Sequence, residues 1–261
     1  MASITGLRVI LAGAATGVGA RTAKLLASRG AKVVVADVNI DAAMEVSAEI
    51  NSCGGSATVI EFDLADEASI KNLIEKGGEW LGGLDSLLNI GADLSPTNLG
   101  NDRAVGEMDA EVWHRTFLVN TTGYALTTKY ALPHLKSGGG GTIINISSMG
   151  GHYMGTPEPQ RVAYAASKAA VHALTRHTAT TYGGDNIRSN TVALGPIATP
   201  TLLKNIEASP KMQEALKKVP LQRLGKPEEV AALLAFMISS DAAYITGDIW
   251  SINGGTHVMT Y

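Results

Sequence analysis

A tyrosine and a lysine one helical turn apart, Tyr164 and Lys168, are the feature of the sequence with the clearest chemistry. Four residues advance an α-helix by about 400°, so the two side chains lie on one face, about 40° apart. A phenol has a pKa near 10, and bringing it to roughly 7 takes about 4 kcal/mol, which a neighbouring cation can provide. Pairs of this kind also occur on solvated helices. The pair therefore predicts a proton-transfer site only if the rest of the chain provides the other reactants.

Three glycines, Gly13, Gly17 and Gly19, lie where an apolar run gives way to a helical pattern. Glycines allow a tight turn there and a close approach of the backbone to a pyrophosphate. The N-terminus of the helix offers free N–H groups and a partial positive charge. We therefore expect a dinucleotide to bind this loop, with Thr16 and Val18 among its contacts.

Asp37 ends the second apolar run, about 20 residues after the loop, where a carboxylate can accept hydrogen bonds from an adenosine ribose. The same carboxylate repels a 2′-phosphate, and the following residues, Val38 and Asn39, provide no cation to attract one. NAD is therefore favoured over NADP as the cofactor. Asp63 ends the third run, where it either reaches the adenine edge together with Leu64 or forms a turn.

Short runs rich in Val, Ile and Leu alternate along the chain with stretches of helical period. Strands are expected near residues 7–12, 32–36, 57–62, 86–88, 142–147, 188–193 and 248–252. Helices are expected near 17–29, 40–52, 67–80, 109–135, 162–182 and 227–238. This alternation predicts a doubly wound α/β fold, with about seven parallel strands and helices on both faces.

No change in composition marks a domain boundary, so residues 1–261 are expected to form a single domain. Two long irregular segments remain, residues 93–108 and 197–221, and the second has a helical pattern around 210–218. Loops of this length in a compact domain usually lie over a site. We therefore expect the segment near 197–221 to cover the substrate.

The composition excludes several other classes of protein. With 261 residues and 45% apolar residues the chain buries a sizeable core, and a net charge of −3 without a basic block argues against nucleic acid as a partner. The single cysteine, Cys53, fits a reducing compartment such as the cytoplasm, and no apolar run is long enough to span a membrane. His172 and His177 lie about 140° apart on their helix, so they cannot chelate one ion, and no metal site is expected.

Taken in order, the motifs resemble those of the short-chain dehydrogenase/reductase (SDR) family over essentially the whole chain. They are the glycine loop, Asn89-Ile90-Gly91-Ala92, Asn120, Ser148, Tyr164 with Lys168, and Gly195-Pro196-Ile197-Ala198-Thr199. The resemblance implies a Rossmann-type fold and hydride transfer between NAD and a carbinol or carbonyl carbon. It also implies a homotetramer that packs through the helices around 109–135 and 162–182.

The resemblance further implies a catalytic set of Asn120, Ser148, Tyr164 and Lys168. In this set Tyr164 transfers the substrate proton and Ser148 holds the substrate oxygen, with Ser147 as an alternative. Lys168 lowers the phenol pKa and binds the nicotinamide ribose, and Asn120 holds a water that links Lys168 to solvent. The implied cofactor contacts, besides the glycine loop and the acids, are Asn89, Gly91, Tyr164, Lys168, Pro196, Ile197 and Thr199.

The expected substrate wall is mostly apolar and has no arginine placed for a carboxylate or phosphate. It consists of Leu94, Met149, His152, Tyr153, Met154, Leu202 and Leu203. We therefore predict a hydrophobic secondary alcohol, or its ketone, as the substrate. The alternatives are a non-catalytic NAD-binding regulatory protein, a 3-oxoacyl reductase-like activity, and a dehydratase or epimerase that holds a nicotinamide on the same fold.

Overall fold

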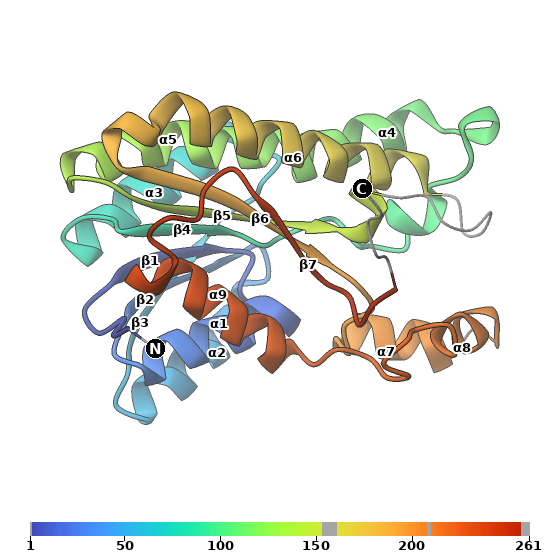
Figure 1. The fold of residues 1–261 in the computed structure, drawn as a ribbon, viewed down its shortest axis with the longest axis horizontal. Coiled ribbons are helices and arrows are strands. Elements are labelled where there is room, and N and C mark those ends of the chain that lie inside the picture. Colours follow the sequence, from blue (N-terminus) through green and yellow to red (C-terminus); the bar gives the residue numbers. More distant parts are fainter. Residues whose placement is uncertain (1, 153–160, 208–209, 257–261) are drawn as a thin grey trace.

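The computed structural model describes residues 2–152, 161–207 and 210–256. It contains a seven-stranded parallel sheet of order β3-β2-β1-β4-β5-β6-β7, placed between layers of helices (Figure 1). The strands are β1 (Arg8–Ala12), β2 (Lys32–Asp37), β3 (Ser56–Glu61), β4 (Ser86–Asn89), β5 (Gly141–Ser148), β6 (Ile187–Leu194) and β7 (Ile249–Ile252). The strand order reverses between β1 and β4, and a crevice opens at such a point at the carboxyl ends of the strands.

Helices cover both faces of the sheet (Figure 1). On one face lie α1 (Gly17–Ser28), α2 (Ile40–Ser52) and α9 (Pro227–Ile238), and on the other α3 (Glu67–Leu81), α5 (Gly123–Ser137) and α6 (Val162–Tyr182). Three shorter helices, α4 (Ala110–Phe117), α7 (Pro200–Glu207) and α8 (Pro210–Leu216), extend past the carboxyl ends of the strands.

Each central strand contributes apolar side chains to both faces, because successive side chains of a strand point in opposite directions. Val33 and Val35 belong to the core cluster under α1 and α9, whereas Val34 belongs to the cluster under α3 and α5. Burial on both faces explains why these strands are continuous apolar runs rather than alternating patterns. Among the described residues, no helix combines the length and the apolar character needed to cross a membrane.

The predicted fold class and the order of the strands and helices are confirmed, with strand ends displaced by at most one residue. The single helix expected over 109–135 is wrong in detail, because a π-helical turn at Leu118–Thr122 separates α4 from α5. A π-turn inserts about one residue, so the apolar pattern continues through it and the sequence does not reveal it. Helix α7 was also not expected, although Pro200 at its first position is typical of a helix start.

Candidate active site

The carboxyl ends of the strands open onto a cleft with a volume of about 980 Å³. The glycine loop, the ends of β2 and β5, the first turns of α6 and the segment after β6 all line it. The predicted residues that line it are Gly13, Thr16, Gly17, Val18, Gly19, Asp37, Asp63, Leu64, Gly91, Leu94, Ser148, Tyr164, Lys168, Ile197, Thr199 and Leu202. Residues far apart in the sequence therefore meet on one surface.

The glycine loop packs too closely on its neighbours to accommodate side chains. Gly13 has φ of +100°, and a Cβ there would lie 2.2 Å from the backbone nitrogen of Gly91. A Cβ on Gly19 would lie 2.0 Å from the carbonyl oxygen of Gly13. The loop thus brings bare backbone to the cleft, the arrangement that lets a pyrophosphate approach closely.

Helix α1 starts at this cleft without a side-chain cap. Thr16 holds the N-cap position but accepts no hydrogen bond from the first turn, and that turn has no acidic residue. By contrast, α2, α3 and α4 are capped by Asn39, Asp66 and Asp109. The N–H groups at the start of α1 therefore suit an anionic ligand, and they fit the pyrophosphate of a dinucleotide.

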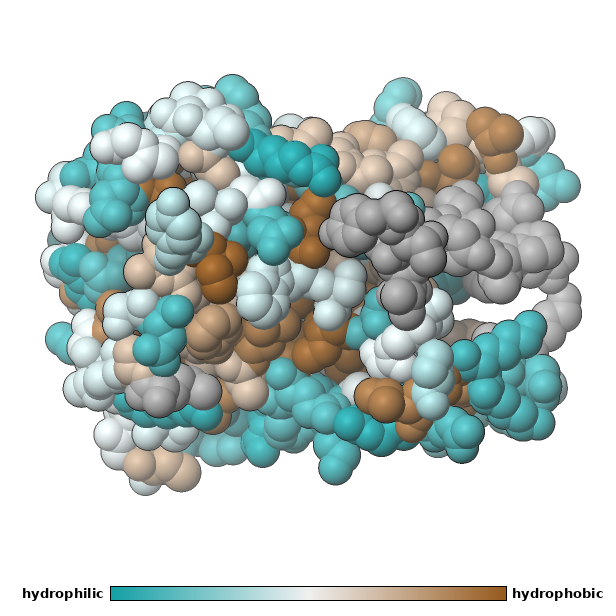
Figure 2. All heavy atoms as spheres, viewed as in Figure 1, coloured by the Kyte–Doolittle hydropathy of each residue, from teal (hydrophilic) through white to brown (hydrophobic). Residues whose placement is uncertain are grey.

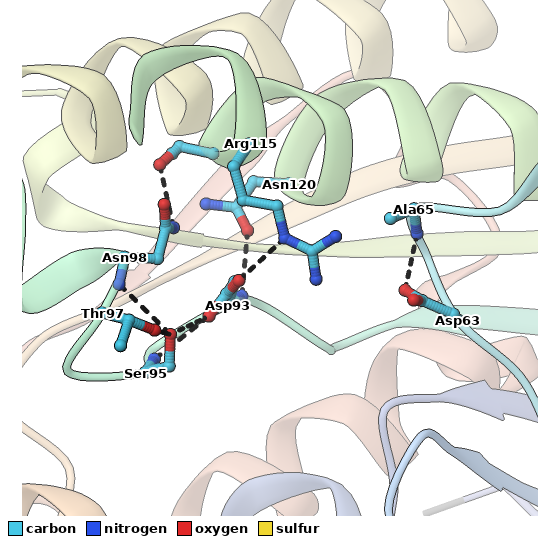
Figure 3. Close-up of polar contacts among 9 residues, drawn as sticks. Asp63, Ala65, Asp93, Ser95, Thr97, Asn98, Arg115 and Asn120 are labelled. Carbon is cyan, nitrogen blue, oxygen red and sulfur yellow. Dashed lines mark hydrogen bonds and ion pairs between the residues drawn. The ribbon is translucent and has the colours of Figure 1, made fainter. Parts of the chain in front are cut away.

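Asp37 joins the end of β2 to the glycine loop. One carboxylate oxygen accepts the N–H of Ala15 at 2.9 Å and the other accepts the N–H of Asn39 at 3.0 Å. Both oxygens retain lone pairs for a hydroxyl donor. Asp63 lines the same cleft while its carboxylate accepts the N–H of Ala65 at 2.8 Å (Figure 3), so the turn-forming role expected as its alternative is present.

Tyr164 and Ser148 meet on the opposite wall of the cleft. Burial raises the pKa of the Tyr164 phenol, and a hydrogen bond with Ser148 and the charge of Arg161 lower it in part. Ser147 also lines the cleft, but its hydroxyl is engaged within the fold, where it pairs with His172 Nε2 at 2.8 Å and donates to the carbonyl of Lys168 at 3.2 Å. Of the two candidate serines, Ser148 is therefore the one beside the phenol.

Lys168 lies under Tyr164 with its side chain almost fully buried, at 1% exposure. Its Nζ donates to the carbonyl of Ile146 at 3.0 Å and lies 4.9 Å and 5.9 Å from the ring centroids of Tyr124 and Tyr164. Burial lowers the Lys168 pKa to about 7. The net shift of the Tyr164 pKa is upward, because burial outweighs the lowering by the Ser148 hydrogen bond and the Arg161 charge. The expected lowering of the phenol pKa by Lys168 stays a prediction.

Asn120 lies in the π-helical turn, fully buried behind the cleft wall. Its Oδ1 accepts the N–H of Asp93 at 3.4 Å (Figure 3), and its Nδ2 donates to the Ser167 hydroxyl at 3.2 Å. Turns of this type are rare and often occur at functional sites. The geometry makes Asn120 a bridge between the segment after β4 and helix α6.

The outer wall of the cleft is mixed in character, which corrects the expectation of a mostly apolar wall without an arginine. Arg115 lines it from α4, and its Nε donates to Asp93 at 3.0 Å (Figure 3). Burial raises the Asp93 pKa, but hydrogen bonds from Ser95 and Arg115 outweigh it, so the pKa lies below its usual value. The arginine was missed because α4 reaches the cleft only through tertiary packing. Other polar residues on this wall are Thr97, Asn98, Asn101, Asp109 and Glu111.

Comparison with known proteins identifies the family. The sequence model described as enoyl-(acyl carrier protein) reductase matches residues 13–257. A probable short-chain type dehydrogenase/reductase from Bradyrhizobium diazoefficiens is 39% identical over 264 residues, covering 100% of this chain and 92% of the relative. The chain belongs to the short-chain dehydrogenase/reductase family. The expected family is thereby confirmed.

Two further SDR relatives carry more specific names. Cis-4-hydroxycyclohexanecarboxylate dehydrogenase of Sinomonas cyclohexanicum is 36% identical over 246 residues, covering 94% of each chain. A solved 7α-hydroxysteroid dehydrogenase, in complex with NADH and 7-oxo glycochenodeoxycholic acid, superposes with a TM-score of 0.88 at 31% identity. That superposition covers 97% of this chain and 94% of the other.

Several predicted residues of this SDR protein do not line the cleft. Asn89 is fully buried behind it, where its amide donates to Asn145 at 2.8 Å and accepts from Thr127 at 2.7 Å. It braces β4 against β5 and α5 and does not line the cleft. Pro196, Met149, His152 and Leu203 also lie off the lining surface, and Tyr153 and Met154 lie outside the described residues. The described residues contain no group of three or more potential metal ligands.

Proposed function

We propose that this SDR protein is an NAD-dependent oxidoreductase that interconverts a hydrophobic secondary alcohol and its ketone, with Tyr164 as general acid and base. Membership of an oxidoreductase family supports the reaction class. The observation that carries the proposal is the Ser148–Tyr164 hydrogen bond, which lies on the same cleft as the glycine loop. That arrangement brings a proton donor to a substrate oxygen beside a dinucleotide site.

NAD, when bound, provides the nicotinamide that accepts or returns a hydride. The start of α1 would hold its pyrophosphate and Asp37 its adenosine ribose, since both face the cleft with hydrogen-bonding capacity left. The cationic side chains among the described lining residues are Arg115 and Lys168. Neither contacts Asp37, so nothing there favours a 2′-phosphate, and this supports NAD over NADP.

Tyr164 transfers the substrate proton, and Ser148 holds the substrate oxygen. In oxidation the Tyr164 phenolate accepts the alcohol proton while Ser148 donates a hydrogen bond to the substrate oxygen, and reduction reverses these movements. Lys168, when protonated, stabilises the phenolate, because its Nζ lies 5.9 Å from the centroid of the Tyr164 ring. Because the Tyr164 pKa is raised, the phenol is protonated at neutral pH, which favours carbonyl reduction there and alcohol oxidation at alkaline pH.

The substrate class is inferred from the cleft and from the relatives. Leu94, Val112, Val119 and Leu202 provide an apolar surface, and Arg115 adds a polar position at the outer wall. One relative is named for a hydroxycyclohexanecarboxylate, and the hydroxysteroid dehydrogenase was solved with a 7-oxo bile acid, so both are associated with a ring compound that carries an acid group. A cyclic or steroid-like secondary alcohol fits this surface best.

A homotetramer is proposed from exposed apolar surface. On α4, Trp113 stacks on Phe117 at 4.8 Å, and the following Leu118 is 39% exposed. The edge strand β7 is only partly buried, and its Trp250 packs on Phe236 at 6.0 Å. Figure 2 shows hydrophobic residues gathered around β7 on the viewed face. Light scattering of the dilute protein tests this: a monomer would contradict it.

The function is tested with a substrate screen. Wild type and Tyr164→Phe are each given NAD or NADP with cyclic alcohols, hydroxysteroids, sugars and acyl-carrier substrates, and the reduced cofactor is followed by absorbance. We expect turnover of cyclic alcohols with NAD, reduced at least about 100-fold by loss of the phenol hydroxyl. Equal rates in the two proteins refute the role of Tyr164. Turnover of sugars or charged acyl carriers alone refutes the substrate class.

The same screen separates the alternatives. A regulatory NAD-binding protein would bind the cofactor, detected by titration, and reduce none of it with any alcohol. A dehydratase or epimerase would change the substrate without a net change in reduced cofactor.

A further inference from the structure

Helix α6, which carries Tyr164 and Lys168, does not cap its own start. Arg161 holds the N-cap position, and its side chain makes no capping hydrogen bond. The cap comes instead from Asp102, in the segment between β4 and α4. One Asp102 oxygen accepts the N–H of Ala163 at 3.1 Å, and the other accepts the N–H of Tyr164 at 2.8 Å. A residue some 60 positions earlier in the chain thus holds the backbone of the candidate acid–base residue.

Asp102 is built into this position. Asp102 is 3% exposed, so its carboxylate is shielded from solvent. A buried charge without a partner is costly. The N-terminus of a 21-residue helix stabilises that negative charge, and Arg161 adds a positive charge beside Asp102 and Tyr164. Without Asp102, two N–H groups in the first turn of α6 lose their partners.

The segment of residues 93–102 links this cap to the cleft. At its start, the N–H of Asp93 donates to Asn120 (Figure 3). In its middle, the Asn98 amide donates to the Thr116 hydroxyl at 3.0 Å. Between these anchors, Leu94 and Ser95 line the cleft. The same segment therefore forms part of the substrate wall and, through its last residue Asp102, accepts a hydrogen bond from the backbone of Tyr164.

We propose that Asp102 is a positioning residue that fixes the first turn of α6 and so sets where the Tyr164 phenol meets Ser148 and the substrate oxygen. The proposal rests on the proposed function for its catalytic meaning. Asp102 does not line the cleft, so it acts through Tyr164 rather than on the substrate. Displacing a reacting group by about 1 Å can lower a rate by about 100-fold.

The test compares Asp102→Ala and Asp102→Asn with the control Asp66→Ala. Asp66 also caps a helix, accepting the N–H of Ala68 at 2.9 Å at the start of α3, and it is not among the residues that line the cleft. We expect kcat to fall about 10- to 100-fold in Asp102→Ala and several-fold in Asp102→Asn, which keeps one acceptor oxygen. The KM for NAD should stay within about twofold in both, because the glycine loop is untouched. Asp66→Ala should lose thermal stability and keep its kcat.

A second measurement needs no turnover. Backbone hydrogen exchange at residues 162–168 should be faster in both Asp102 variants and unchanged in Asp66→Ala. If wild type oxidises no alcohol, the proposed function fails, while this exchange still decides whether Asp102 holds Tyr164. If Asp102→Ala does not fold, Asp102→Asn carries both measurements. The proposal is overturned if the folded Asp102 variants exchange their backbone hydrogens at the wild-type rate. If wild type is an active enzyme, a wild-type kcat in these variants overturns it as well.

Discussion

Replacing Lys168 by Met should reveal the energetic cost of a buried ammonium. Burial lowers the Lys168 pKa from 10.5 to about 7. The difference of about 3.5 corresponds to about 5 kcal/mol at 1.36 kcal/mol per pKa unit, an upper bound because a protein relaxes around a buried charge. Methionine has a similar length and no charge, so it removes this cost.

The sign of the pH dependence follows from proton binding. Above about pH 7 native Lys168 releases its proton, while the unfolded chain keeps it up to about pH 10.5, so the unfolded state binds more protons and wild-type stability rises with pH. The lysine should therefore be most costly below about pH 7, and the cost should shrink by about 2 kcal/mol between about pH 7 and pH 9.

Urea unfolding of wild type and Lys168→Met across that pH range measures the difference directly, because the other titrating groups cancel between the two proteins. Between about pH 7 and pH 9, the free energy of unfolding of wild type should increase by about 2 kcal/mol relative to that of the variant. A difference that stays constant within about 0.5 kcal/mol would refute the reasoning, since Lys168 would then keep its ordinary pKa in the fold.

Gly13→Ala should weaken NADH binding at least about tenfold in a fluorescence titration, because its Cβ has no room; Gly54→Ala, at φ +82° with nothing within 4 Å, should bind normally. The Asp85 carboxylate accepts hydrogen bonds from Nε and Nη2 of Arg8, and these bonds outweigh the effect of burial and lower the Asp85 pKa. Its stabilisation should be present above about pH 4 and lost as the pH falls through that lowered pKa, so acid unfolding of Asp85→Asn should lack this component. For Tyr164, whose pKa is raised, kcat/KM for oxidation should keep rising into the alkaline range, and a decline there would contradict the assignment.

The strands and most helices were predictable because their signals are local. Runs such as Val33-Val34-Val35 are apolar on both faces of a parallel sheet, and Tyr164 and Lys168 meet through helical spacing alone. A reversal of the strand order belongs to the doubly wound fold that the alternation predicts, but its position between β1 and β4 does not follow from any residue pattern. Local signals therefore carry the elements and the motifs within them.

The remainder depends on tertiary packing. Arg115 and Asp102 reach the site only because α4 and the segment before it fold over the cleft, and neither lies in a motif. One sequence signal for Asp102 exists: Arg161 is a poor N-cap residue, so a long helix starting after it needs a cap from elsewhere. The sequence could not place the side chain of Asn89, because a polar residue at the end of a strand can face the cleft or brace the sheet, and only its contacts distinguish the two.

Transfer of deuterium from substrate to cofactor tests the central claim most directly. A cyclic alcohol deuterated at its carbinol carbon is incubated with NAD and the protein, and the reduced cofactor is analysed by mass spectrometry. The proposed reaction predicts one deuterium in the reduced nicotinamide with wild type, formed at least about 100-fold more slowly with Tyr164→Phe. Reduced cofactor without deuterium, or equal rates of labelling in the two proteins, would contradict it.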